Sequence, residues 1–178
     1  NNADVIYHSY RRFPDRPASI RPQFYCVEVP DCLFHRTVPD RVLSPSLDPT
    51  IPGGAGNIKR IGPIVREGYD PAPGSGIPSR VVIMLSGSVF GSPVSFSRET
   101  YPFDINVLGR GAPAGVGDSD RIRYHGKVRE TAEFLNSADL LIINGGFSAV
   151  SEAFCMRKPM VVIPVPRHAE QWVNAKTV

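Results

Sequence analysis

The sequence contains few cysteines, no long apolar run and little net charge, and each shortage excludes a class of protein. Three cysteines in 178 residues form neither an even disulfide framework nor a Cys-x-x-Cys pair. This favours a reduced, intracellular protein, although a bridge between Cys26 and Cys32 stays open. No apolar run approaches the ~18 residues of a membrane span, and we expect no secretory leader. A formal charge of +3 is too small to indicate nucleic acid, so we expect no nucleic-acid partner.

Clustered metal ligands are also lacking. The four histidines and the cysteines are scattered along the chain, so the sequence predicts no metal site. We interpret His8 and His35 as structural, because histidines in strand-like or loop segments usually are. The single tryptophan, Trp172, is interpreted as a packing residue.

The chain is otherwise ordinary globular material, with 42% hydrophobic and 21% charged residues. Residues 66–79 hold three prolines, three glycines and no apolar period, which is the composition of a linker. We therefore predict a first domain over residues 1–65, an interdomain linker over 66–79 and a second domain over 80–178. The chain begins without Met and ends at Val178, only a few residues into a helix predicted from Ala169, so we expect it to be a fragment.

The first domain shows little helical periodicity. Residues 4–9 and 24–29 predict short strands, separated by a loop rich in proline and arginine. Residues 41–44 predict a third strand, and a short apolar segment follows at 61–65.

The second domain alternates strands and helices. Apolar runs predict strands over residues 81–85, 104–109, 122–126, 140–143 and 160–165. Helical periodicity covers residues 129–138, and the crossover at 89–103 is a weak helix that Pro93 interrupts. Strands joined mainly by helices predict an α/β fold with a parallel, Rossmann-like sheet.

One stretch of the second domain combines a buried strand with a glycine turn and a helix. The apolar run 140–143 ends at Asn144-Gly145-Gly146, and Ser148 is predicted to cap the helix that follows. Arg157 and Lys158 are predicted in the last turn of this helix, and Pro159 ends it. Glycines between a strand and a helix let a ligand approach backbone N–H groups at the positive end of the helix, which favours phosphate.

The same stretch carries a family resemblance. Its pattern is GG-x-S-x(3)-E-A-x(4)-KP-x(3)-IP-x(3)-H-x-EQ-x(2)-NA, from Gly145 to Ala175. This pattern is similar to the donor-site signature of GT-B glycosyltransferases, notably UDP-sugar enzymes like the N-acetylglucosaminyltransferase of lipid II synthesis and related microbial glycosyltransferases. The resemblance implies two Rossmann-like halves. The chain would hold the end of the acceptor-side domain and a truncated donor-binding domain.

The resemblance also implies a reaction. A UDP-sugar would be the co-substrate, with no other cofactor, and a hexose or N-acetylhexosamine would pass to a lipid-linked or glycan acceptor with inversion. A base in the first domain would deprotonate the acceptor hydroxyl, but no residue of this chain is identified as that base. The implied location is the cytoplasm, compatible with peripheral association at the inner face of the membrane.

Eleven residues are the expected contacts of the donor. Gly145, Gly146 and Ser148 would cradle the diphosphate, and Ser86-Gly87-Ser88, a turn after the first strand, would face it from the other side. The peptide of Val128 would contact the nucleobase. His168 would contact phosphate or sugar, or else be a surface loop residue, while Glu170 and Gln171 would contact the transferred sugar.

The sequence allows two interpretations of Glu152. Its carboxylate, one helical turn after Ser148, would accept hydrogen bonds from both ribose hydroxyls. An acidic residue near a helix start also stabilises the helix by ~0.3–1 kcal/mol, so a purely helical role stays open.

Two other functions stay open beside the transferase. The chain could be a donor-binding half that works with a separate acceptor-side partner, or a non-catalytic binder of nucleotide sugars. It could also belong to a nucleotide-sugar epimerase with the GT-B fold, which needs further acidic and histidine residues in the first domain.

Overall fold

The structure, a computed structural model, describes residues 2–48, 50–51, 53–71, 76–85, 96, 101–113 and 119–178. The chain divides into two compact units that alternate along the sequence. Unit 1 comprises Asn1–Ile64, Gly145–Ser151 and Pro164–Val178, and unit 2 comprises Val65–Asn144 and Glu152–Ile163.

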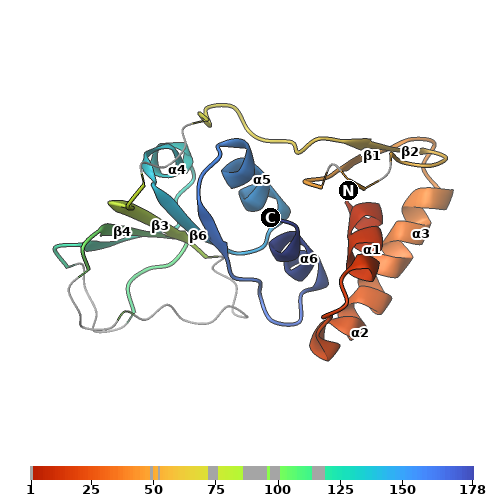
Figure 1. Ribbon diagram of the computed structural model, residues 1–178, viewed down its shortest axis with the longest axis horizontal. Helices are drawn as coiled ribbons and strands as arrows, with labels where there is room; N and C mark the ends of the chain where they lie inside the picture. Colours follow the sequence, from red (N-terminus) through yellow and green to blue (C-terminus); the bar gives the residue numbers. More distant parts are fainter. Residues whose placement is uncertain are drawn as a thin grey trace. The chain divides into compact units, whose positions relative to one another are not determined.

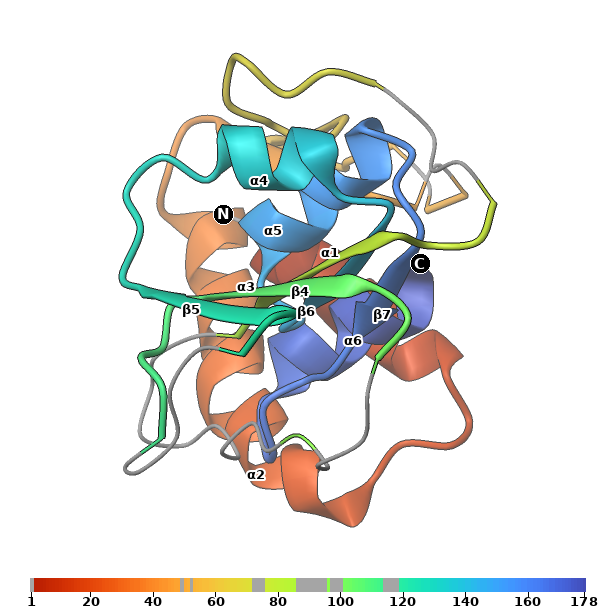
Figure 2. The same ribbon diagram turned by 90° about the vertical axis from the view of Figure 1, so that its left-hand side faces the viewer.

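Unit 2 contains a five-stranded parallel sheet. Its strands are β3 (Arg80–Met84), β4 (Asp104–Leu108), β5 (Ile122–Gly126), β6 (Leu140–Ile143) and β7 (Met160–Val162). They lie in the order β5-β4-β3-β6-β7, and every neighbouring pair is parallel. Figures 1 and 2 show this sheet in two views. The predicted α/β class with a parallel, Rossmann-like sheet is therefore confirmed.

The sheet is held by apolar side chains on successive residues of its central strands. Val81 pairs with Ile105 on one side and with Leu140 on the other. Val81, Val82 and Ile83 are all buried, because a central parallel strand is covered on both faces. The predicted strand at 140–143 is confirmed to the residue, and the strand predicted at 160–165 ends earlier, at Val162.

One short helix of unit 2, α4 (Ala132–Ser137), lies along one face of this sheet (Figure 2). It begins three residues later than the predicted 129–138. Lys158 donates from Nζ to the carbonyls of Asn136 (2.8 Å) and Ala138 (2.9 Å) at its carboxyl end. A cation there satisfies carbonyl groups that the helix itself leaves without partners.

Unit 1 is mainly helical. It contains α1 (Ala3–Arg12), α2 (Arg21–Gln23), a π-helical turn (Phe24–Glu28), α3 (Val29–Thr37) and α6 (Ala169–Thr177). A short parallel pair, β1 (Val42–Pro45) and β2 (Ile58–Ile61), completes it (Figure 1). The core joins α1 and the π-helical turn to α6, and its buried residues are Ile6, Tyr10, Ile20, Phe24, Ala169 and Val173.

The strands predicted at 4–9 and 24–29 are wrong, because both segments are helical. Ile6 and Tyr10 are buried four residues apart, as are Phe24 and Glu28, which is the spacing of one helix face. Within six residues rich in β-branched and aromatic side chains, the four-residue spacing of a helix face cannot be distinguished from the two-residue alternation of a strand. The strand predicted at 41–44 is confirmed, and the segment at 61–65 is displaced to β2. Trp172 packs edge-on against Phe13, as predicted.

Helix α5 (Phe147–Cys155) begins before the predicted cap. The carbonyl of Gly146 accepts from the N–H of Val150 at 3.1 Å, so Gly146 precedes the helix and Ser148 lies within its first turn. Glycine is tolerated at this cap position because its backbone is unrestricted. At the other end Arg157 has φ of 56°, so Arg157 and Lys158 follow the helix rather than belong to its last turn. Residues with positive φ commonly end helices.

Candidate functional site

The strand order places the switch point of the sheet between β3 and β6. From β3 the chain builds outward through β4 and β5, then returns to the other side of β3 as β6 and β7. Open α/β sheets bind ligands beyond the carboxyl ends of the strands at such a point. Ser86-Gly87-Ser88 follows β3 and Asn144-Gly145-Gly146 follows β6. The two predicted glycine turns thus directly follow the two strands that flank the switch point. The sequence alone did not reveal that these two strands are neighbours in the sheet.

Ser86, Gly87 and Ser88 lie outside the described residues, so their role stays a prediction. Of the other expected donor contacts, Val128 and Glu152 belong to unit 2. The remainder belong to unit 1, namely Gly145, Gly146, Ser148, His168, Glu170 and Gln171.

The two glycines of the turn differ in their surroundings. A Cβ built on Gly145 would lie 2.3 Å from the carbonyl oxygen of Gln171, so α6 packs against bare backbone here. Asn174, itself buried, donates from Nδ2 to the Gly145 carbonyl at 2.9 Å. A Cβ on Gly146 would meet nothing within 4 Å. Gly145 is therefore explained by packing, whereas Gly146 borders open space.

The start of α5 has the features of an anion site. Its nine residues follow Gly146 directly, and the first N–H groups of a helix lack intrahelical acceptors. Ser148 is exposed in the first turn, which leaves its hydroxyl accessible. Backbone N–H groups, the helix dipole and a hydroxyl together suit a phosphate.

The residues predicted to contact the sugar shape the start of α6. His168 is the N-cap of α6, and its Nδ1 accepts from the Gln171 N–H at 3.4 Å. The side-chain oxygen of Gln171 accepts from the Val165 N–H at 3.0 Å. Glu170 is half-buried in the first turn. His168 and Gln171 thus have structural contacts that the sequence analysis did not anticipate, and their contact with a sugar stays a prediction.

Glu152 is buried and has a partner within unit 2. Its side chain is 3% exposed, and Arg66 forms an ion pair with it through Nε and Oε1 at 2.7 Å. Nη2 of Arg66 donates to Oε2 at 3.2 Å and to the Thr131 hydroxyl at 3.3 Å. The carboxylate raises the pKa of Arg66 by hydrogen bonding. The ribose contact of Glu152 stays a prediction, and Arg66 is a residue that sequence reasoning missed.

Val128 lies in the loop between β5 and α4, and its side chain is half-buried. Gly126, the last residue of β5 and two residues before Val128, has φ of 61°, a left-handed conformation that glycine adopts without strain. Contact of the Val128 peptide with a nucleobase stays a prediction.

Metal ligands do not gather in the described part of the chain, where no group of three or more His, Cys, Asp or Glu could hold an ion. The sequence does contain one Asp-x-Asp pair, Asp118 and Asp120. Asp118 lies outside the described residues, so the absence of a metal remains a prediction. No helix among the described residues is long and apolar enough to cross a membrane.

Residues 118–178 match the model of glycosyl transferase family 1. The matched segment includes β5, α4, β6, α5, β7 and α6. It therefore contains the glycine turn and every described residue expected to contact the donor.

Two curated proteins are similar to the chain. It is 28% identical over 139 residues to an uncharacterized glycosyltransferase of Methanopyrus kandleri, covering 66% of this chain and 38% of the relative. It is 33% identical over 78 residues to the UDP-N-acetylglucosamine–N-acetylmuramyl-(pentapeptide) pyrophosphoryl-undecaprenol N-acetylglucosamine transferase of Shouchella clausii, covering 41% of this chain and 22% of that protein. The chain thus spans well under half the length of either relative. No solved structure is significantly similar to it.

Proposed function

We propose that the chain is part of a GT-B glycosyltransferase that uses a UDP-sugar, and that Gly146 and the first turn of α5 bind the donor diphosphate. The observation that carries this is the open space beside Gly146, at the start of a nine-residue helix. This helix follows a strand that flanks the switch point of the sheet. The family match over 118–178 supports the transferase class.

The donor would be oriented by several of the predicted contacts. The Val128 peptide would face the nucleobase, Glu152 the ribose, and Glu170 and Gln171 the sugar hydroxyls. The acceptor would be lipid-linked or a glycan. The lipid-linked choice is supported by the Shouchella clausii relative, which is named as a pyrophosphoryl-undecaprenol N-acetylglucosamine transferase.

The chemistry follows from a positive helix end beside the diphosphate. An acceptor oxygen would form a bond to the anomeric carbon from the face opposite the leaving group, which inverts that centre. The bond from the anomeric carbon to the diphosphate oxygen breaks, and a base takes the proton of the acceptor hydroxyl. N–H groups at the start of α5 would stabilise the charge that develops on the leaving UDP.

Gly146→Val tests the diphosphate site. Its two γ-methyl groups would fill the space in front of the helix N–H groups, so the affinity for UDP should fall at least ~10-fold, about 1.4 kcal/mol. Calorimetric titration with UDP measures this. Gly111→Val is the matched control, because a Cβ on Gly111 also meets nothing within 4 Å. Equal UDP affinity in a folded Gly146→Val variant and in the control would refute the proposed site.

A further inference from the structure

A cavity of about 480 Å³ lies within unit 1, and none of the residues proposed to bind the donor lines it. It lies among α1, α3, β2 and the glycine-containing segment before β2. The lining residues are Asp4, His8, Arg36, Gly53, Ala55, Gly56, Asn57, Ile58 and Arg60. Its volume falls within the ~300–1,000 Å³ of sites for small ligands.

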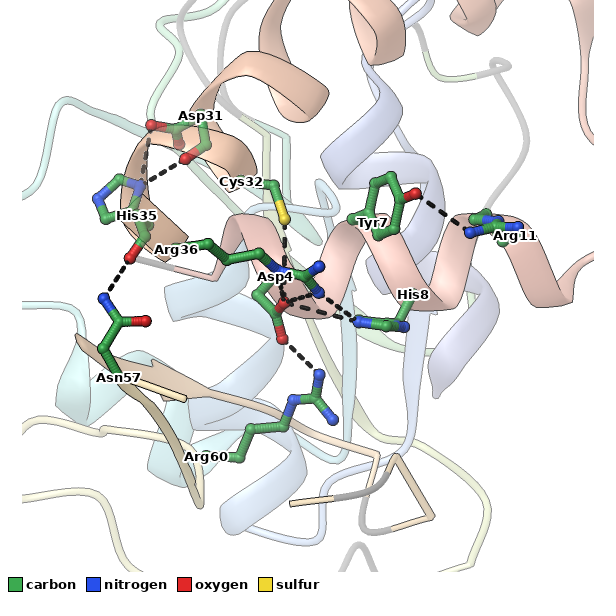
Figure 3. A network of polar contacts seen from close by, with 10 residues as sticks. All are labelled: Asp4, Tyr7, His8, Arg11, Asp31, Cys32, His35, Arg36, Asn57 and Arg60. Atoms are coloured by element: carbon green, nitrogen blue, oxygen red, sulfur yellow. Dashed lines mark hydrogen bonds and ion pairs between the residues drawn. The ribbon is translucent and has the colours of Figure 1, made fainter. Parts of the chain in front are cut away.

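The charges that line this cavity do not balance. Arg36 donates from Nε to Oδ1 of Asp4 at 3.0 Å, and its Nη2 donates to the same oxygen. Arg60 donates from Nη2 to Oδ2 of Asp4 (Figure 3). Burial opposes the charge of Asp4, but the bonds from both arginines outweigh burial and hold the pKa of this carboxyl below its ordinary value. Two guanidinium groups thus share one carboxylate, and with His8 uncharged the residues that line the cavity carry a net charge of +1 among themselves.

His8 is uncharged in this arrangement. Its Nε2 lies 2.7 Å from Nη2 of Arg36, and a guanidinium donates but never accepts. Nε2 must therefore be the acceptor, which places the imidazole proton on Nδ1. Burial lowers the pKa of His8, and Arg60, Arg36 and Arg11 lower it further while Asp4 raises it.

The glycine segment supplies an open wall. A Cβ built on Gly53 or on Gly56 would meet no atom within 4 Å, so a ligand can approach the backbone there. Asn57 fixes the end of this segment by donating from Nδ2 to the carbonyls of His35 (2.8 Å) and Pro39 (2.6 Å). Gly56 has φ of 63°, a conformation that favours glycine over residues with a Cβ.

We infer that this cavity binds the phosphate group of a small phosphorylated ligand. Guanidinium groups suit phosphate because their fixed N–H donors match its oxygens. The carboxylate of Asp4 lies between the two guanidinium groups and holds both of them, as Figure 3 shows, and the net positive charge of the lining residues attracts an anion. Arg36, whose side chain is 39% exposed, is the arginine that a ligand reaches from solvent. This site does not depend on the proposed function, because it shares no residue with the donor site.

Inorganic phosphate added to the 178-residue chain tests the inference, with the His8 imidazole followed by NMR. An anion beside His8 stabilises its protonated form, so saturating phosphate should raise the pKa of His8. Arg36→Gln keeps the ion pair of Asp4 with Arg60 and should weaken phosphate binding at least ~10-fold, about 1.4 kcal/mol. Arg21→Gln, which removes an equal charge outside the cavity lining, should bind phosphate as the wild type does.

Gly146→Val distinguishes this site from the donor site. In this variant phosphate should still raise the pKa of His8, even though UDP binding is lost. The inference is overturned if phosphate gives no saturable effect at His8. It is also overturned if Arg36→Gln, shown by circular dichroism to be folded, binds phosphate as well as Arg21→Gln does.

Discussion

Nε of Arg66 lies 2.7 Å from Oε1 of Glu152, 86 residues later in the chain. The guanidinium group of Arg66 donates to both carboxylate oxygens of Glu152. Its Cζ also lies 5.1 Å from the centroid of the Tyr69 ring. Tyr69 in turn shares a 3.0 Å hydrogen bond with Thr131. The segment predicted as a linker is thus fastened at its start to the side chain expected to bind ribose.

Removing Arg66 should destabilise the chain. Glu152 is buried, and an unpaired buried carboxylate can cost about 3–5 kcal/mol. Because Arg66 is more than half exposed, water screens the pair, and we expect Arg66→Gln to lower the free energy of unfolding by about 1–2 kcal/mol. Urea unfolding measures this. In a double-mutant cycle, Arg66→Gln should lose most of its effect once Glu152 is Gln. A full, unchanged cost in that background would contradict the pairing.

The strands of the sheet could be predicted from sequence because their signal is local. Leu140 to Ile143 is a continuous apolar run between Asp139 and Asn144, and such a run suits a strand covered on both faces. The segment at 4–9 has no comparable signal. It is helical because Ile6 and Tyr10 pack with Ala169 and Val173 of α6, residues that lie far along the chain. Tertiary packing there decides what a short window leaves ambiguous.

The candidate site was predictable only in part, for a similar reason. A glycine turn before a helix has a local pattern, and Gly146 with its open surroundings fits that pattern. The steric need for Gly145 comes from the backbone of Gln171, and the partner of Glu152 comes from Arg66. Both partners lie far away in the sequence, so the residues around Gly145 and Glu152 do not reveal these contacts. The sequence therefore shows which residue stands at each position but not the packing or ion pair that requires it.

The two glycines of the turn should respond differently to alanine. The Cβ of Gly145→Ala would lie 2.3 Å from the Gln171 carbonyl oxygen, and overpacking of this kind costs about 1–3 kcal/mol. Gly146→Ala has open space and should cost only about 0.5 kcal/mol, through its poorer capping of α5. Thermal and urea unfolding of both variants measure the difference. Equal stability of the two variants would argue against close packing of α6 at Gly145.

Glu28 should make stability depend on pH. Burial raises the pKa of this carboxyl, with a further rise from Glu170 and Asp31, against a lowering by the Gln23 hydrogen bond. The folded state therefore holds this proton up to a higher pH than the unfolded state does. Above the ordinary value of about 4.5, the free energy of unfolding then falls as pH rises, until the folded-state pKa is passed.

Glu28→Gln removes this dependence and keeps the side-chain size. The variant should gain stability relative to the wild type as pH rises from below 4.5, and it should be at least as stable at pH 7. Urea unfolding across this pH range measures the difference. Glu130→Gln, which neutralises an exposed carboxylate, controls for the loss of one charge. A stability difference that does not change with pH would contradict a raised pKa at Glu28.

Ligand discrimination can separate the two roles of Glu152. If its carboxylate accepts from the ribose hydroxyls, a charge-assisted hydrogen bond of ~1.5–3 kcal/mol is at stake, or roughly ten- to a hundred-fold in affinity. The wild type should then prefer UDP over 2′-deoxy-UDP, and Glu152→Gln should lose most of that preference. Calorimetric titration with both nucleotides measures it.

Arg66→Gln supplies the matched control, because it breaks the same ion pair and leaves the carboxylate in place. A carboxylate has about four acceptor positions, so ribose and Arg66 can share it. If Glu152 binds ribose, Arg66→Gln keeps the preference for UDP while Glu152→Gln does not. If Glu152 serves only to hold Arg66, both variants discriminate between the nucleotides as the wild type does. If Glu152→Gln still prefers UDP over 2′-deoxy-UDP as the wild type does, Glu152 does not bind the ribose. The ion pair with Arg66 would then be the role of this residue.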